Sequence, residues 1–436
     1  MSLHQTWQRI HGAFDPLVPA GDAQHGRVER PYTPLPDILL DLDFPDGFRR
    51  ELIVGASGAG KTTELLAVQR GTRDLRSVHL DLLEHFEARG DVTALDRLEA
   101  WEVLLLIGLS LYRYGVEGLG HAWTSARPAA LTSAIAGVTG QEPAALDLAG
   151  MIGEVALVVS ESTAAAVPGV APALRALRSV TSHLTATLQL GAPRRSDPAL
   201  ADGDPRVHAL LVAVNGMLVE LYQVFHTRLL LLVDGIDRGG PDLARRLFED
   251  STLLAQLNCH AVMTAPLSLR HRNLRVWRSR FLGNVPVLDP NDPMRPAARV
   301  DFFRALWRDR ATAAGGSTLL TDPLVDRLAW ASGGLVRQFC ELVQGVSRRG
   351  YRADAPADAA MVDAEIDDWR RRWEADLDAS TVALLREVLR LRALTGDEGE
   401  RALLDQRCIV AWPNDSTWYF PHPLLLLRKV RPPDAP

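Results

Sequence analysis

Residues 55–62 are Gly55-Ala-Ser-Gly-Ala-Gly-Lys61-Thr62, which is the pattern G-x-x-x-x-G-K-T. A short apolar run, Glu51–Val54, precedes this stretch and predicts a buried strand, and Thr62–Gln69 has helical character. Between a strand and a helix, the backbone N–H groups of such a loop bind phosphate and the threonine hydroxyl binds Mg²⁺. The stretch therefore predicts a phosphate-binding loop, against the alternative of a glycine-rich turn that matches by chance.

The cation in this stretch is also unusual for the chain. Of the 48 basic residues only Lys61 and Lys429 are lysines, and the rest are arginines, as expected of a GC-rich genome. A phosphate-binding loop requires a compact ammonium that passes a tight backbone, which a guanidinium cannot do as well. The scarcity of lysine elsewhere supports the interpretation of Lys61 as a phosphate ligand.

Length and composition set the class of protein. A chain of 436 residues predicts two to four domains, and 47% hydrophobic residues suffice for real cores. A net charge of −6 excludes a basic nucleic-acid coat. The three cysteines are too far apart for a zinc site or a disulfide framework, and no signal pattern or membrane span is evident. We expect a soluble, cytoplasmic, bacterial protein.

The pattern of apolar runs, glycines and prolines divides the chain into blocks. We expect an N-terminal extension over 1–45 and an α/β core over 46–290 that contains a helical insertion at 91–226. A helical lid over 291–355 and a domain similar to a winged helix over 360–430 follow. Within the insertion, the small apolar stretches at 151–159 and 163–173 favour packing against the core, with partner docking as the alternative.

A second strand is predicted at Ser77–Asp81, and a second candidate site follows the third predicted strand. Residues 228–237 form an apolar run that ends in Asp234, with Asp237 three residues later. A continuous apolar run is typical of a parallel strand buried on both faces, and ligands bind at the carboxyl ends of such strands. We expect Asp234 to position Mg²⁺ or, alternatively, to cap the next turn. Asp237 either polarises the attacking water or caps the helix that begins near Pro241.

Two further strands complete the predicted sheet. The fourth is His260–Thr264, and its terminal Thr264 either contacts the γ-phosphate or the attacking water, or satisfies its own turn. The fifth is expected at Gly283–Asp289, directly after the basic segment that contains Arg278 and Arg280.

Together these features resemble the AAA+ and STAND-type P-loop ATPases, over roughly residues 45–345 and weakly to 430. Ser279-Arg280-Phe281 resembles the Ser-Arg-Phe box of clamp loaders and origin-recognition ATPases, where the arginine reaches the nucleotide of the neighbouring subunit. Arg280 matches this finger position, with Arg278 as the fallback. Ser332-Gly-Gly-Leu-Val-Arg337 resembles the lid motif whose arginine contacts the γ-phosphate of the same chain, so Arg337 matches that sensor.

The resemblance implies ATP and Mg²⁺ as cofactors. The nucleotide would be bound by Gly55, Ser57, Gly58, Ala59, Gly60, Lys61, Thr62, Thr63 and Arg337, and Mg²⁺ by Thr62 and Asp234. Asp237, Thr264 and Arg280 would act in hydrolysis.

Two departures from the family pattern bear on activity. Most AAA+ proteins place Asp-Glu at the end of the third strand, whereas Asp234-Gly-Ile-Asp237 is more similar to the slow STAND and NACHT switch ATPases. STAND proteins also often lack a finger, so the alternative for Arg280 is a solvated basic face. That face would comprise Arg270, Arg272, Arg275, Arg278 and Arg280.

The function predicted from these features is an ATP-binding, slowly hydrolysing molecular switch that controls assembly or an effector partner. By family analogy alone it would act in a conditional response or anti-phage defence. One alternative is a DNA-loading ATPase similar to initiators, and another is a scaffold that binds nucleotide without hydrolysis. Partners would be further copies of the chain or an effector protein. Nucleic acid is less favoured, because charges in the C-terminal domain balance.

Overall fold

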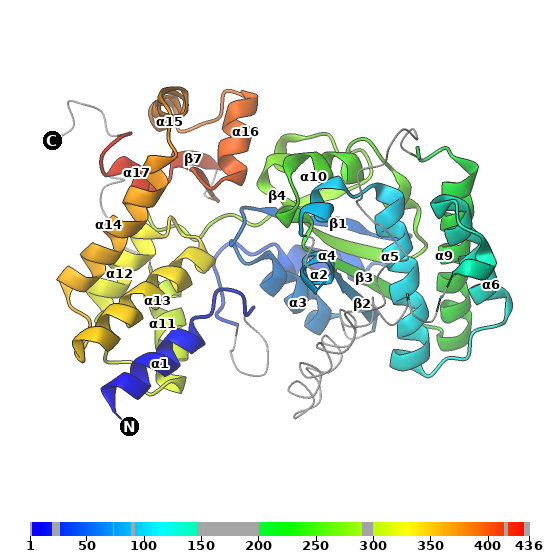
Figure 1. Cartoon of the computed structure of the whole chain (residues 1–436), viewed down its shortest axis with the longest axis horizontal. Helices are drawn as coiled ribbons and strands as arrows, with labels where there is room; N and C mark the ends of the chain where they lie inside the picture. Colours follow the sequence, from blue (N-terminus) through cyan, green and yellow to red (C-terminus); the bar gives the residue numbers. More distant parts are fainter. Residues whose placement is uncertain are drawn as a thin grey trace. The chain divides into compact units, whose positions relative to one another are not determined.

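The computed structural model describes residues 2–19, 27–72, 74–88, 92–146, 148, 151, 200–289, 300–413 and 417–430. The chain divides into two compact units, each built from separated segments (Figure 1). We call Met1–Pro34, Gly55–Glu64 and Phe281–Pro436 the loop unit, and Leu35–Val54 and Leu65–Arg280 the sheet unit. Of the predicted insertion, residues 152–199 lie outside the described part of the chain, as do 414–416 of the predicted C-terminal turn.

The sheet has five strands in the order β2-β3-β4-β1-β5. They are β1 (Arg50–Gly55), β2 (Arg76–Asp81), β3 (Leu229–Asp234), β4 (His260–Pro266) and β5 (Arg278–Phe281). β3 pairs parallel to β2 and to β4. The amide of Ala261 donates to the carbonyl of Arg49, so β4 and β1 begin at the same edge. These strands therefore also end at one common edge, where β1 passes into the predicted phosphate-binding loop.

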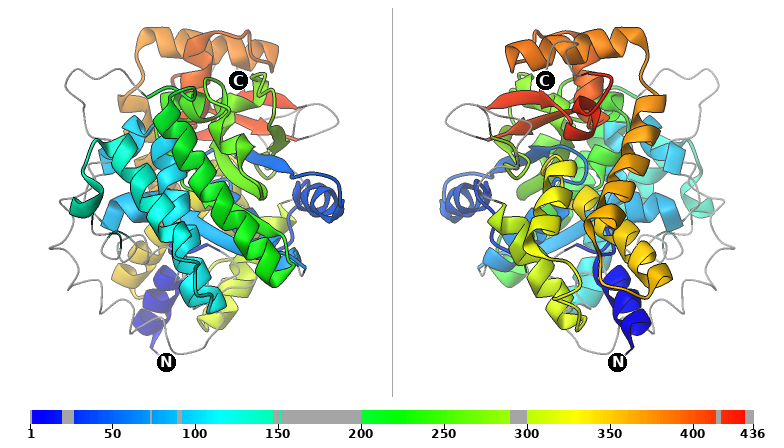
Figure 2. Two further views of the ribbon diagram at one scale, coloured as in Figure 1. Left: turned by 90° about the vertical axis from the view of Figure 1, so that its right-hand side faces the viewer. Right: turned by 90° about the vertical axis from the view of Figure 1, so that its left-hand side faces the viewer.

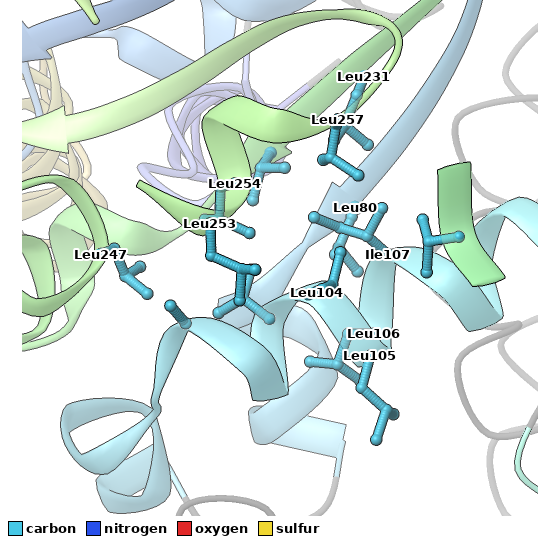
Figure 3. Packing of buried hydrophobic residues seen from close by; sticks show 14 of the residues in the cluster. Leu80, Leu104, Leu105, Leu106, Ile107, Leu231, Leu247, Leu253, Leu254 and Leu257 are labelled. Carbon is cyan, nitrogen blue, oxygen red and sulfur yellow. The ribbon is translucent and has the colours of Figure 1, made fainter. Parts of the chain in front are cut away.

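Helix α2 (Leu35–Asp43) precedes β1. Helices α3 (Lys61–Gly71), α4 (Leu82–Ala88) and α10 (Pro241–Phe248) connect the strands, together with the insertion helices α5 (Ala100–Arg113), α6 (Ala126–Thr139) and α9 (Pro205–Phe225). α9 packs against α5 and α6 (Figure 2). Figure 3 shows leucines of α5, α10, β2 and β3 converging in one buried cluster. The described part of the insertion thus packs on the sheet, whereas the stretches 152–159 and 163–173, on which the prediction of packing was made, lie outside the described residues.

One described helix, Pro205–Phe225, is long and apolar enough to cross a membrane by length and composition. Half of its apolar window is buried within the protein, which is also usual for a core helix of a globular domain. Val212, Tyr222 and Val224 on its outer face are exposed.

The loop unit contains a helical bundle. It consists of α1 (Leu3–Ala13), α11 (Asp301–Ala313), α12 (Asp322–Ala331), α13 (Val336–Ala353) and α14 (Ala359–Ala375). α1 packs along α13, and the buried aromatic rings of Phe14, Phe303 and Phe339 join α1, α11 and α13. The predicted lid is therefore helical, and the N-terminal extension supplies one of its helices.

The C-terminal part follows the predicted order of a winged helix. Helices α15 (Ala379–Leu391) and α16 (Glu398–Asp405) precede the antiparallel hairpin of β6 (Ile409–Trp412) and β7 (Trp418–Pro421), and α17 (Pro423–Leu426) ends it. α15 packs on β7 and α16 on β6. The rings of Trp412 and Trp418 stack at 4.7 Å on the buried hairpin.

The prediction of a fifth strand at Gly283–Asp289 is wrong, because the strand is β5, five residues earlier. The N–H groups of Asn284 and Val285 donate instead to the carbonyls of Ala411 and Gly334. Pro286 has no N–H to donate to a neighbouring strand. The apolar run after residue 283 therefore links the lid to the C-terminal hairpin rather than extending the sheet.

Candidate functional site

The phosphate-binding loop leaves β1 at Gly55 and enters α3 at Lys61. Gly58 and Gly60 have φ angles of +86° and +102°, in the region that favours glycine. A Cβ at Gly58 would lie 2.8 Å from Cβ of Arg337, so the loop and the start of α13 approach each other too closely for a side chain there. The predicted glycines are thus required by conformation and by space.

The carbonyl groups of this loop are bound by donors from its own unit. Nζ of Lys61 donates to the carbonyl oxygens of Gly55 and Ala56 at 2.7 and 2.8 Å. The amide of Arg337 donates to the carbonyl of Gly58 at 3.1 Å. Because a trans peptide points its C=O and the next N–H in opposite directions, the N–H groups of Ala56 and Ser57 point away from Nζ of Lys61, whereas the N–H of Ala59 donates to the carbonyl of Ala56 at 3.1 Å. A glycine-rich turn at the N-terminus of a helix is a common anion-binding concavity, and this loop has that position before α3.

Arg337 lies where the sequence predicted a lid residue beside the loop. It is the second residue of α13, after a turn in which Gly333 and Gly334 have positive φ angles. A Cβ at Gly334 would lie 2.0 Å from the carbonyl oxygen of Val285, so only glycine fits. Nε of Arg337 is buried and has no hydrogen-bond partner among the described residues, which leaves a donor for an anion.

Three residues that the sequence analysis missed surround the loop. Arg30 donates to the carbonyl of Ala59 at 2.5 Å, and Arg27 donates to both carboxylate oxygens of Glu64 at 3.0 and 3.1 Å. Glu64 is 1% exposed, and its carboxylate also accepts from Thr33. In the sequence, Arg27 and Arg30 are two charged residues of a Pro-containing segment, 27–34. That pattern does not indicate which loop they contact.

Ser57, Thr62 and Thr63 complete the predicted set around the loop. Thr62 and Thr63 lie in the first turn of α3, half-buried, and Lys61 is 4% exposed. Thr62 is therefore placed at a helix N-terminus, where the aligned peptide dipoles favour an anion.

In the sheet unit, Asp234 ends β3 and is 3% exposed. Its Oδ1 accepts hydrogen bonds from Oγ1 of Thr264 and from the amide of Gly235, both at 2.8 Å. Thr264, which is fully buried in β4, therefore contacts and orients the carboxylate of Asp234. The second carboxylate oxygen remains as the group that could face a ligand.

Asp81, which the sequence analysis did not single out, lies beside Asp234 at the end of β2. The two residues are register partners of neighbouring parallel strands. Burial and the charge of Asp234 raise the pKa of Asp81 to about 7. Burial also lowers the pKa of His79 on the same strand. The signal was available, because Asp81 ends its predicted strand as Asp234 does.

Asp237 lies in the short helical turn Ile236–Arg238, with its side chain 8% exposed. It is not the N-terminal cap of α10, because that position is Gly240. The capping alternative is therefore not observed, and its role toward water stays a prediction.

Arg280 lies in β5 and is bound by acidic groups of its own unit. Its Nε donates to Glu51 at 2.6 Å, Nη2 contacts Asp41, and Nη1 lies 3.7 Å from Asp37. Its side chain is 17% exposed, whereas that of Arg278 is 60% exposed and pairs only with Asp41. A finger role would require Arg280 to exchange these carboxylates for a phosphate.

Among the described residues, no three His, Cys, Asp or Glu side chains come together in a way that could hold a metal ion by themselves. A Mg²⁺ ion at this protein would therefore need oxygen ligands from a bound phosphate and a hydroxyl, in addition to a carboxylate. That is the usual situation for Mg²⁺, which keeps several waters and binds through few protein ligands.

Comparison with known proteins adds little to this geometry. No protein-family model and no curated protein matches the chain. Among solved structures the chain is similar to Cdc6p of Pyrobaculum aerophilum, with 14% identity over 96% of each chain and a TM-score of 0.36. A similarity at that level carries no argument by itself. The parallel sheet, the glycine loop between β1 and α3, the helical bundle and the C-terminal hairpin agree with the predicted α/β fold of a P-loop NTPase.

Proposed function

We propose that this protein is an ATP- and Mg²⁺-binding switch whose lid and C-terminal domain respond to the nucleotide. The observation that carries the proposal is the hydrogen bond from the amide of Arg337 to the carbonyl of Gly58, because it ties the lid to the phosphate-binding loop. Lys61 and Thr62 would bind the phosphates and Mg²⁺, and Asp234 would position Mg²⁺. The ion would neutralise charge on the phosphates.

The path from the loop to the C-terminal domain supports a switch. The turn before Arg337 bonds to Val285, since the amide of Val285 donates to the carbonyl of Gly334. Nε1 of Trp412 in β6 donates to the carbonyl of Val285 at 3.2 Å. A nucleotide that moves the turn would therefore disturb the hairpin. Nucleotide biases such an equilibrium only by its differential contacts in the two states.

The test is nucleotide binding with a report from the C-terminal domain. A fluorescent ATP analogue is titrated into the wild type and Arg337→Ala, while limited proteolysis follows cleavage after residue 376. We expect ATP to change cleavage in the wild type and not in Arg337→Ala, which retains binding through Lys61. Binding without any change in cleavage in the wild type would contradict the switch and favour the nucleotide-bound scaffold.

Hydrolysis would be slow in this proposal. Asp237 would orient water, Thr264 would act beside Asp234, and Arg280 would complete the site of a neighbouring copy. Phosphate release measured at increasing protein concentration tests this part, because a site shared between copies gives turnover per chain that rises with assembly.

A DNA-loading ATPase is the second candidate, and the hairpin of β6 and β7 behind α15 and α16 favours it. Binding to duplex DNA that weakens steeply with salt would support this candidate over the effector switch. The absence of such binding at low salt would exclude it.

A further inference from the structure

The segment Arg27–Pro34, which we call the strap, places a buried cation against the phosphate-binding loop. Arg30 is 6% exposed, and its guanidinium donates through Nη1 to the carbonyl of Ala59 and through Nη2 to the carbonyl of Gly283. These partners come from two distant parts of the chain, 29 and 253 residues away. Arg30 therefore joins the strap, the loop and the segment after β5 inside one unit.

Burying a guanidinium costs free energy unless its donors are satisfied. Burial lowers the pKa of Arg30 to about 10, so the side chain still carries its charge at neutral pH. Nearby Glu64 opposes this effect, and the strap binds Glu64 through Arg27 and Thr33. The strap thus brings both the cation and the contacts that keep its counter-charge in place.

The peptide that Arg30 binds joins Ala59 to Gly60, and the flanking N–H of Ala59 and carbonyl of Gly60 are bound to Ala56 and Glu64. Ala59 lies between Gly58 and Gly60, and both glycines have positive φ angles and no side chain to restrict rotation. Without an external contact, the Ala59–Gly60 peptide could turn its carbonyl toward the phosphate. That orientation would place a negative dipole where the ligand's charge lies.

We propose that Arg30 is a positioning residue that fixes this peptide so that the N–H of Gly60 points toward the bound phosphate. The peptide is planar and trans, so the carbonyl of Ala59 and the N–H of Gly60 point in opposite directions. Binding of the carbonyl by Arg30 therefore orients the N–H away from Arg30. The inference rests on the proposed nucleotide-binding function, and it assigns the strap to the phosphate-binding site.

The test compares Arg30→Met, Arg30→Lys and the matched control Arg9→Ala. Met fills much of the same space but donates no hydrogen bond, Lys keeps the charge with a different geometry, and Arg9 is an exposed arginine of the same unit. ADP and ATP affinities are measured well below each variant's unfolding midpoint. We expect Arg30→Met to bind about tenfold to a hundredfold more weakly, Arg30→Lys to fall between, and Arg9→Ala to stay within about twofold.

A purely structural role predicts a different pattern. If Arg30→Met unfolds at a lower temperature but binds ADP like the wild type, Arg30 only supports packing and the inference is overturned. If Arg30→Met does not fold, the affinity of Arg30→Lys decides in the same way. Equal affinities of Arg30→Lys and the wild type would then overturn it.

Amide hydrogen exchange separates this inference from the proposed function. If the wild type binds no nucleotide, the proposed function fails, and exchange at residues 55–62 without nucleotide then tests Arg30 alone. Faster exchange there in Arg30→Lys than in the wild type, with unchanged exchange in α5, supports the inference. Equal exchange in the loop would overturn it.

Discussion

The phosphate-binding loop and the sheet edge formed by Asp81 and Asp234 carry groups of opposite charge. In the loop, donors from Lys61, Arg30 and Arg337 bind backbone carbonyls, so that the protein itself holds the loop's conformation. At the edge, Asp81 and Asp234 end neighbouring strands, and the charge of Asp234 contributes to raising the pKa of Asp81 to about 7. One region is prepared for an anion and the other for a cation.

This difference shows which part of a nucleotide site the fold builds by itself. Backbone carbonyls can be bound by groups of the protein, so the loop has its geometry without a ligand. Asp81 and Asp234 also accept hydrogen bonds from the protein, but the charge of Asp234 still disfavours that of Asp81. We therefore expect the conformation of the loop to be the same with and without Mg²⁺, and the charge state of the edge to depend on Mg²⁺.

The largest expected effect is the loss of the loop's ammonium. Lys61→Ala should weaken ATP binding by about a hundredfold or more, because it removes the charge-assisted bonds to phosphate. Fluorescent-nucleotide titration measures this effect. Lys429→Ala is the matched control, since Lys429 is the other lysine and is exposed. Equal affinities for Lys61→Ala and the control would exclude the nucleotide site.

At the acidic edge, Asp234→Asn should remove the Mg²⁺-dependent part of ATP affinity, by about tenfold, and leave affinity in excess EDTA unchanged. Asp237→Asn should leave affinity within about twofold and slow turnover, because it would act on water alone. Isothermal titration with and without Mg²⁺, followed by phosphate release, measures both. Asp81→Asn is the neighbouring control, and a larger loss there than in Asp234→Asn would reassign the metal ligand.

Arg280 tests whether a cation of the sheet unit acts on a neighbouring copy. Arg280→Ala should lower the thermal midpoint by about 3–6 °C, since it removes the hydrogen bonds of a mostly buried guanidinium to Glu51 and Asp41. Arg278→Ala should lower it less, because Arg278 is exposed.

As a finger, Arg280 should also support turnover far more than binding, and mixing Arg280→Ala with Lys61→Ala should restore some activity. No recovery in chains that co-assemble would remove the finger role.

The smallest expected effect concerns pH. Burial raises the pKa of Glu51 from 4.5 to about 7, and the charges of Arg278 and Arg49 oppose this effect only in part. The folded protein therefore keeps a proton that the unfolded chain has lost, so stability decreases as pH rises from about 4.5 to 7. Urea unfolding should show this as about 1 kcal/mol, allowing for solvent screening. In Glu51→Gln the slope should decrease, and an unchanged slope would assign it to other groups.

The sequence predicted the first four strands and the loop because their signals are local. Apolar runs identify buried strands, and the pattern ending in Lys61-Thr62 specifies its own strand–loop–helix context. The fifth strand was misplaced because Asn284 and Val285, at the start of the predicted strand, donate their N–H groups to the C-terminal hairpin and to the turn before α13. No local pattern distinguishes an apolar run in a sheet from one that bonds to a lid.

Arg30, in contrast, could not have been identified from its neighbours in sequence. Arginine is the common cation of this chain, and the partners of Arg30 lie 29 and 253 residues away. Asp81 was within reach, since it ends its predicted strand as Asp234 does. The roles of Asp237, Thr264 and Arg280 in hydrolysis stay predictions, because they depend on a bound nucleotide.

The wide separation of the groups around the loop has a consequence for synthesis on the ribosome. The loop and the strap emerge early, but Gly283 and Arg337, which complete their hydrogen bonds, are translated more than 220 residues after Lys61. Contacts this distant in sequence form late, since the intervening chain must first be closed into a loop. A nascent chain that already contains all residues of the phosphate-binding motif would therefore still lack the hydrogen bonds from Arg30 to Gly283 and from Arg337 to Gly58. Nucleotide would begin to stabilise this protein only once the lid has left the ribosome.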